Sequence, residues 1–151
     1  MTTIVLVTPE IPQNTGSVGR TCVALDMELV LIRPYGFAIT EAGVRRAGLD
    51  YWQHVRLGEF DSWDDFVAAR GVRAEQLFLF SKDAPRSFYE PDYPYDAVLV
   101  FGCETKGLPV ALREAFAARL VSLPMRSPYI RSLNLANAVT AAAYQALRGR
   151  L

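Results

Sequence analysis

The sequence predicts an α/β fold in which helices cover both faces of a parallel, twisted sheet. Short apolar runs bounded by turn residues, typical of buried strands, recur along the 151-residue chain. Helix-like segments separate these runs, and this alternation favours a parallel sheet. The length is that of one domain, and we assign residues 1–151 to it.

The expected strands are residues 3–7, 28–32, 76–80, 97–101 and 120–123. A helix is expected after residues 9–13, which cannot be helical because each proline biases the preceding residue toward extended geometry. Asn14 or Thr15 would cap it. Further helices are expected at residues 40–47, from about 61 to Gly71, at 109–118 with Pro109 in the first turn, and at 132–148. Residues 49–57 are interpreted as irregular, and residues 81–96 as a covering loop.

Composition excludes several classes of protein. No apolar run reaches the length of a membrane span and no signal peptide precedes the first strand, so we expect a cytoplasmic protein without membrane contact. Cys22 and Cys103 lack metal-ligand spacing, which predicts reduced thiols and no metal. His54 is the only histidine, so a nucleophilic triad is not supported, and a structural role fits it better.

The net charge is zero, so no overall basic field indicates a nucleic-acid partner. The sixteen cations are nevertheless fourteen Arg and two Lys. The arginine side chain matches phosphate as a planar fork, although a GC-rich genome would produce the same bias. Any RNA-binding surface must therefore be a local patch, for which pairing of two chains is one route.

A candidate ligand loop follows the apolar run at residues 97–101. Gly102 and Gly107 flank it, and a loop at the carboxyl end of a central strand is where α/β sheets bind ligands. The spacing resembles a phosphate loop, but Leu108 and Pro109 stand where Lys and Ser or Thr are required. No G-x-G-x-x-G occurs, which disfavours a dinucleotide site. A plain strand–turn–helix connection remains the alternative.

Two further polar clusters begin predicted helices. The first is N-T-G-S-V-G-R, in which Asn14 and Arg20 can face the same side of a helix. The second is R-S-L-N-L-A-N, in which Ser132 is expected to cap the last helix and Asn134 and Asn137 to share a face. The alanines that follow are small enough for close helix–helix approach, although the helix propensity of alanine also explains them.

Three segments together resemble a known enzyme family. P-E-I-P-Q-N-T-G-S-V-G-R, V-F-G-C-E-T-K-G-L-P and L-P-M-R-S-P-Y-I-R-S-L-N-L-A-N-A-V look like motifs 1, 2 and 3 of the SPOUT (α/β-knot) RNA 2′-O-methyltransferases. The R-R-A-G-L-D-Y segment extends the resemblance, which covers nearly the whole chain. The TrmL-like branch, the tRNA (cytidine/uridine-34-2′-O)-methyltransferases, is the most similar.

The resemblance implies a C-terminal deep trefoil knot, an exception to the rule against threaded loops. It also implies an S-adenosylmethionine (AdoMet) pocket inside that knot, no metal, and a homodimer whose active site lies at the subunit interface. The implied cofactor residues are Phe80, Gly102, Gly107, Leu123 and Ser132. The implied catalytic residues are Asn14, Arg20, Glu104, Ser132 and Asn134. The candidate contacts to tRNA are Arg20, Arg45, Arg46, Arg126, Tyr129 and Arg131.

The expected reaction is methyl transfer from AdoMet to the ribose 2′-OH of a tRNA anticodon-loop nucleotide, position 34. An arginine is effectively always protonated, so we assign Arg20 to positioning and give the hydroxyl proton to a phosphate or water. Two alternatives remain open at this point. The enzyme could act on another tRNA or rRNA site, or the chain could be an inactive knotted RNA-binding module.

Overall fold

The computed structural model describes residues 1–37 and 50–151. These residues build a six-stranded sheet with the order β3-β2-β1-β5-β4-β6, in which every neighbouring pair is parallel. The predicted helix at residues 40–47, with Arg45 and Arg46, lies outside the described residues. The parallel α/β class is confirmed.

Five strands occupy the predicted positions with small changes at their ends. The strands are β1 (Thr3–Val7), β2 (Glu28–Ile32), β3 (Arg56–Phe60), β4 (Leu77–Phe80), β5 (Val98–Phe101) and β6 (Leu120–Val121). The α-helices are α1 (Pro12–Ala24), α3 (Trp63–Arg70), α4 (Val110–Ala115) and α5 (Leu135–Ala146). The short 3-10 helices are η1 (Asp50–His54), η2 (Ala74–Gln76) and η3 (Ala117–Arg119). None of the described helices is long and apolar enough to cross a membrane.

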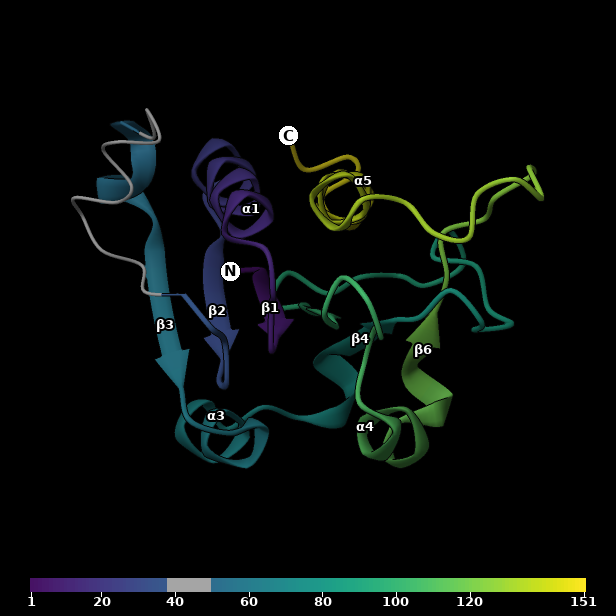
Figure 1. The fold of residues 1–151 in the computed structure, drawn as a ribbon, viewed down its shortest axis with the longest axis horizontal. Coiled ribbons are helices and arrows are strands. Elements are labelled where there is room, and N and C mark those ends of the chain that lie inside the picture. Colours follow the sequence, from purple (N-terminus) through teal and green to yellow (C-terminus); the bar gives the residue numbers. More distant parts are fainter. Residues whose placement is uncertain (38–49) are drawn as a thin grey trace.

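Helices cover both faces of the sheet, as predicted (Figure 1). Helices α1 and α5 lie on one side, and α3 and α4 lie on the other. One buried cluster therefore joins Val18 of α1 and Val139 of α5 to alternate strand residues. The other joins Phe66 of α3 and Leu112 of α4 to the remaining strand residues. Because β1, β4 and β5 are buried on both faces, these strands are apolar without alternation.

The order of the strands determines where a ligand can bind. From β1 the chain crosses to β2, on one side of β1. From β5 it passes β4 and reaches β6, on the other side. Loops leave these two strands in opposite directions at their carboxyl ends. Such a switch point is where open parallel sheets bind ligands. The candidate loop after β5 thus lies at the most favourable place in the sheet.

The start of α1 differs from the prediction. The helix begins at Pro12 with Ile11 as its N-cap, so Pro12 and Gln13 are helical and neither Asn14 nor Thr15 is the cap. Proline is tolerated at the first helical position because its missing N–H would have no partner there. The side chain of Asn14 is consequently free for a contact outside the helix.

The start of α5 also differs. Asn134 is its N-cap, and the Asn134 side chain accepts hydrogen bonds from the N–H groups of Ala136 and Asn137 at 2.9 and 3.3 Å. The prediction that Ser132 caps this helix was wrong. Asparagine competes as well as serine for this role, and Asn134 stands next to the first helical turn. Pro109 is likewise the residue before the first turn of α4, not a member of it.

The alanine-rich face of α5 packs within the same chain. Ala136, Ala142, Ala143 and Ala146 are buried in the cluster that also contains α1. The hydroxyls of Thr21 in α1 and Thr140 in α5 lie 2.8 Å apart and share a hydrogen bond. Small side chains on this face thus bring α5 close to α1.

Candidate functional site

A cavity of about 670 Å³ lies at the carboxyl edge of the sheet. The loops after β4, β5 and β6 form most of its wall, and the starts of α1 and α5 complete it. The lining residues are Ile11, Asn14, Phe80, Ser81, Lys82, Asp83, Phe101, Gly102, Cys103, Glu104, Thr105, Lys106, Gly107, Leu108, Arg113, Leu123, Met125, Arg131, Ser132, Leu133, Asn134, Leu135 and Ala138. Its size is that of a pocket for a small molecule or cofactor.

The loop after β5 folds back tightly on itself. The N–H of Cys103 donates to the carbonyl of Gly107 at 3.2 Å, and the N–H of Gly107 donates to the carbonyl of Cys103 at 3.0 Å. A Cβ atom on Gly102 would lie 1.9 Å from the carbonyl carbon of Gly107, and Gly107 has φ +69°. Only glycine fits at Gly102, and Gly107 occupies a conformation that favours glycine. This closure fixes the loop, and all of residues 102–107 line the cavity.

The carboxylate of Glu104 connects this loop to the start of α1. It accepts hydrogen bonds from the N–H groups of Glu10 and Ile11 at 2.8 and 3.0 Å. It also accepts from Nδ2 of Asn14 at 3.3 Å. A carboxylate at a helix N-terminus is favoured by the helix dipole and satisfies N–H groups that have no intrahelical partner.

The third segment joins the same network. Nδ2 of Asn134 donates to Oδ1 of Asn14 at 3.0 Å, and Oδ1 of Asn134 caps α5. Asn14 therefore donates to Glu104 and accepts from Asn134, which links the segments after β1, β5 and β6. These three residues are separated by at least 30 positions in the sequence, yet hydrogen bonds join them at one wall of the cavity.

A further hydrogen bond joins the segment after β1 to the loop after β5, and here the carboxylate belongs to the segment after β1. The hydroxyl of Thr105 donates to Oε1 of Glu10 at 2.7 Å. Hydrogen bonds from Cys103 and Thr105, with the charge of Lys106, hold the pKa of Glu10 below its usual value. Glu10 and Glu104 thus each bind the other's segment.

The apolar part of the cavity comes from the strands beneath it. The rings of Phe80 and Phe101 stack with centroids 4.5 Å apart and planes 14° apart. Leu123 after β6 and Leu135 at the start of α5 line the cavity and pack against the same buried cluster. The cavity therefore has an apolar floor and a polar wall, which suits a ligand with a flat aromatic part and polar groups.

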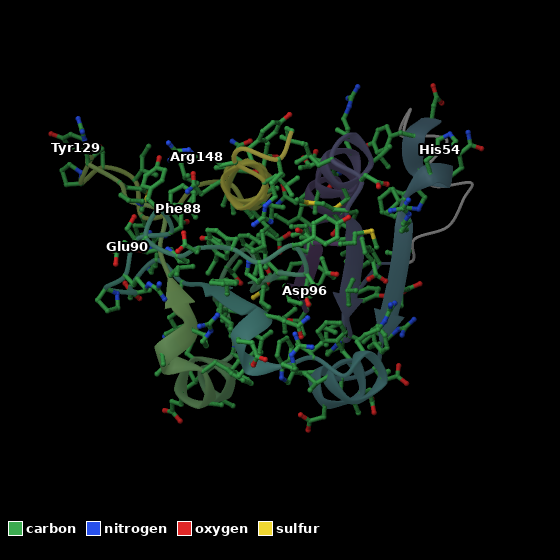
Figure 2. The ribbon with its side chains drawn as sticks, turned by 180° about the vertical axis from the view of Figure 1, so that it is seen from behind. His54, Phe88, Glu90, Asp96, Tyr129 and Arg148 are labelled. Atoms are coloured by element: carbon green, nitrogen blue, oxygen red, sulfur yellow. The ribbon has the colours of Figure 1, made fainter. Side chains whose placement is uncertain are left out.

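Most of the predicted site residues line this cavity. They are Asn14, Phe80, Gly102, Glu104, Gly107, Leu123, Arg131, Ser132 and Asn134. Arg126 and Tyr129 lie on the connection between β6 and α5 but do not line the cavity, and Tyr129 is 93% exposed. Figure 2 shows Tyr129 at the far end of a loop that projects from the body of the molecule.

Arg20 lies apart from the cavity of its own chain. Its guanidinium carbon is 5.4 Å from the centroid of the Tyr51 ring, the range of a cation–π contact. The Tyr51 hydroxyl donates to the carbonyl of Gly16 at 2.9 Å, which fixes that ring against α1. Burial raises the pKa of Tyr51. His54, at the end of η1, is exposed and does not line the cavity.

Sequence reasoning missed several cavity residues. Lys82, Met125 and Arg113 all line it. Lys82 is the second residue after β4, so its position at the carboxyl edge was available from the strand prediction. Arg113 lies inside a short helix and belongs to no recognisable motif, so no pattern indicated it.

The two thiols differ in their surroundings. Both cysteines are free. Burial raises the pKa of Cys22 to about 12. Cys103 is half-buried at the cavity. Among residues 1–37 and 50–151, no group of three or more His, Cys, Asp or Glu side chains could hold a metal ion.

Comparisons with known proteins place this geometry in a family. A protein of Burkholderia cenocepacia named tRNA (cytidine(34)-2′-O)-methyltransferase is 42% identical over 149 residues, which cover 98% of this chain and 95% of the relative. A solved structure that concerns the 2-OH methylation of C/U34 on tRNA is 46% identical, with a TM-score of 0.86 and coverage of 98% and 95%.

A third relative was solved with a ligand. The SpoU methyltransferase AviRb from Streptomyces viridochromogenes, in complex with the cofactor AdoMet, is 27% identical with a TM-score of 0.79. The match covers 98% of this chain and 60% of AviRb. The model of the SpoU rRNA Methylase family matches residues 1–144, and the chain therefore belongs to that family.

Proposed function

We propose that the protein transfers a methyl group from AdoMet to the ribose 2′-OH of nucleotide 34, cytidine or uridine, in a tRNA anticodon loop. The observation that carries the proposal is the hydrogen-bonded joining of Asn14, Glu104 and Asn134 at one wall of the cavity. The relatives named for this reaction match the whole region that contains these residues.

The cavity fits AdoMet by the chemistry of its lining. The floor of Phe80, Phe101 and Leu123 suits an adenine ring, and the loop backbone after Gly102 offers hydrogen bonds to it. Ser132 and the neighbouring backbone provide further polar contacts. AdoMet, when bound, supplies an electrophilic methyl group on sulfur, so the proposed reaction uses no metal.

The protein's part in the reaction is to position the ribose. The 2′-oxygen bonds to the methyl carbon as the carbon–sulfur bond breaks, and that electron pair stays on sulfur. Alignment of the three atoms can supply most of the acceleration. Arg20 stays protonated and binds a neighbouring phosphate, which lowers the pKa of the hydroxyl. The hydroxyl proton passes to that phosphate or to water.

The proposed active site requires two copies of the chain. Arg20 is absent from the lining of its own cavity and is exposed on α1, where a second copy can approach. A mixture of Arg20→Ala and Asn134→Ala chains tests this arrangement. If Arg20 serves the partner's cavity, the mixed dimer contains one intact site and activity returns. Activity that stays absent after mixing contradicts it.

The proposal includes the trefoil knot that the family resemblance implies. In its support, the connection from Ser81 to Asp96 contacts the C-terminal segment at two separated points. The N–H of Phe88 donates to the carbonyl of Ser122 at 2.9 Å, and the Arg150 guanidinium donates to the carbonyl of Tyr93. The segments before and after residues 123–134 therefore both form hydrogen bonds to the connection between β4 and β5.

The tRNA contacts remain those that the sequence predicts. Arg126, Tyr129 and Arg131 lie on the connection before α5, and the exposed Tyr129 ring can stack on a splayed base. Arg45 and Arg46 are retained as candidates from the sequence. The enzyme would act in the cytoplasm, where tRNA is found.

Labelled AdoMet and unmodified tRNA test the function directly. We expect label in tRNA and a nucleotide 34 whose 3′ phosphodiester resists alkaline hydrolysis. tRNA binding without label would instead favour an inactive RNA-binding module. Label confined to ribosomal RNA would contradict the proposed substrate. Arg20→Lys should lower turnover strongly, and near-normal turnover would contradict a bidentate phosphate contact.

A further inference from the structure

Arg113 is a cation at the cavity with an unsatisfied buried nitrogen. It lies on α4, is half-buried and lines the cavity. Its Nε is shielded from solvent and has no hydrogen-bond partner among the described residues. A buried donor left without a partner is costly, and a water, an ion or a ligand that binds there would relieve that cost.

The described acids that line the cavity do not supply that partner. Two carboxylates of the described residues line it, those of Asp83 and Glu104. Glu104 already accepts three hydrogen bonds, all from the segment around α1. Asp83 is exposed and forms no ion pair among the described residues.

The other cations of the cavity are in a different position. Lys82, Lys106 and Arg131 are exposed, so water can solvate their charged groups. Arg113 alone combines a cavity position with a solvent-shielded, unpartnered nitrogen among the described residues. An anion that enters the cavity would therefore gain most from Arg113.

We propose that Arg113 binds the carboxylate of the amino-acid end of the methyl donor. This inference rests on the proposed function, because it takes the cavity to be the donor site. AdoMet carries one anionic group, that carboxylate, and arginine presents a planar fork that matches it. The donor's sulfonium and ammonium groups are cationic and are repelled by Arg113, which favours one orientation of the donor. The carboxylate persists in the product, so Arg113 binds donor and product alike.

Calorimetric titration with two ligands tests the inference. S-adenosylhomocysteine (AdoHcy) carries the amino-acid end, whereas 5′-methylthioadenosine lacks it. For Arg113→Gln we expect AdoHcy to bind about tenfold to a hundredfold more weakly, the range of a charge-assisted hydrogen bond, and 5′-methylthioadenosine to bind as in the wild type. Arg113→Lys should retain part of the AdoHcy affinity. Arg148→Gln, the same change at an exposed position in the turn after α5, should bind both ligands normally.

Other outcomes would overturn the inference. Wild-type AdoHcy affinity in Arg113→Gln would show that the guanidinium does not meet the carboxylate. Equal weakening of both ligands, with a lowered melting temperature, would assign Arg113 to structure alone. Weaker tRNA binding with normal AdoHcy binding would assign it to a phosphate. Failure of the wild type to bind either ligand would instead refute the proposed function, so the two failures are distinguishable.

Discussion

Replacement of Glu104 by glutamine tests the network that joins the three cavity segments. The substitution keeps the shape of the side chain but removes its charge and one acceptor oxygen. Glu104 accepts from two backbone N–H groups and from Asn14, at 2.8, 3.0 and 3.3 Å. In Glu104→Gln, one oxygen must serve donors that two oxygens served before, and the new amide N–H₂ faces other donors.

The magnitude follows from these bonds. A hydrogen bond to a charged group contributes about 1.5–3 kcal/mol, and these bonds lie at the exposed rim, so we take about 2 kcal/mol for the whole change. For a chain of this length, that loss lowers the melting temperature by about 4–8 °C. It weakens AdoHcy binding by up to about 30-fold, a value reached when the whole loss falls on the geometry of the loops.

Thermal melting and calorimetric titration with AdoHcy measure both effects. The matched control is Glu114→Gln, because Glu114 is exposed on α4 and forms no side-chain hydrogen bond within the described part of the chain. We expect wild-type values for this control. A Glu104→Gln protein with wild-type melting temperature and wild-type affinity would show that the three segments hold together without this carboxylate.

Three further substitutions or treatments test separate parts of the account. Gly102→Ala should abolish AdoHcy binding, because the added Cβ would lie 1.9 Å from the loop backbone; Gly36→Ala, with open space around its Cβ, should melt and bind as the wild type. Glu10 has a lowered pKa, so its contribution to stability is present above the unfolded value of 4.5 and is lost as pH falls through the folded value. The melting temperature of the wild type should therefore exceed that of Glu10→Gln at pH 7, and the difference should shrink below about pH 4.5; a constant difference would contradict this. Iodoacetamide at pH 8 should label Cys103 and leave Cys22 intact until unfolding, as mass spectrometry would show, because burial raises the pKa of Cys22 to about 12.

Buried strands were the most predictable part of the fold. β1 and β2 match the prediction residue for residue, because the turn residues on each side of a continuous apolar run determine where the strand begins and ends. β3 (Arg56–Phe60) was missed since this edge strand contains Arg56, Gly58 and Glu59, and its burial is only partial. Its strand geometry comes from pairing with β2, a tertiary contact that no local pattern encodes.

The candidate site was predictable where residues form recognisable clusters. Asn14, Glu104 and Asn134 were identified from their segments, but the hydrogen bonds among them depend on how three distant loops meet. Asn134 was given the wrong local role because a serine and an asparagine compete for one cap. Arg113 was not found at all, since its importance comes from burial beside the cavity and not from its neighbours in sequence.

Direct titration of the purified protein with AdoMet tests the central claim, that three loops at the carboxyl edge of this sheet build one methyl-donor site. The account predicts saturable heat with one donor bound per chain. It also predicts weaker binding in Asn134→Ala, which removes the link from α5 to Asn14. A folded protein that produces no binding heat at any accessible AdoMet concentration would contradict the claim.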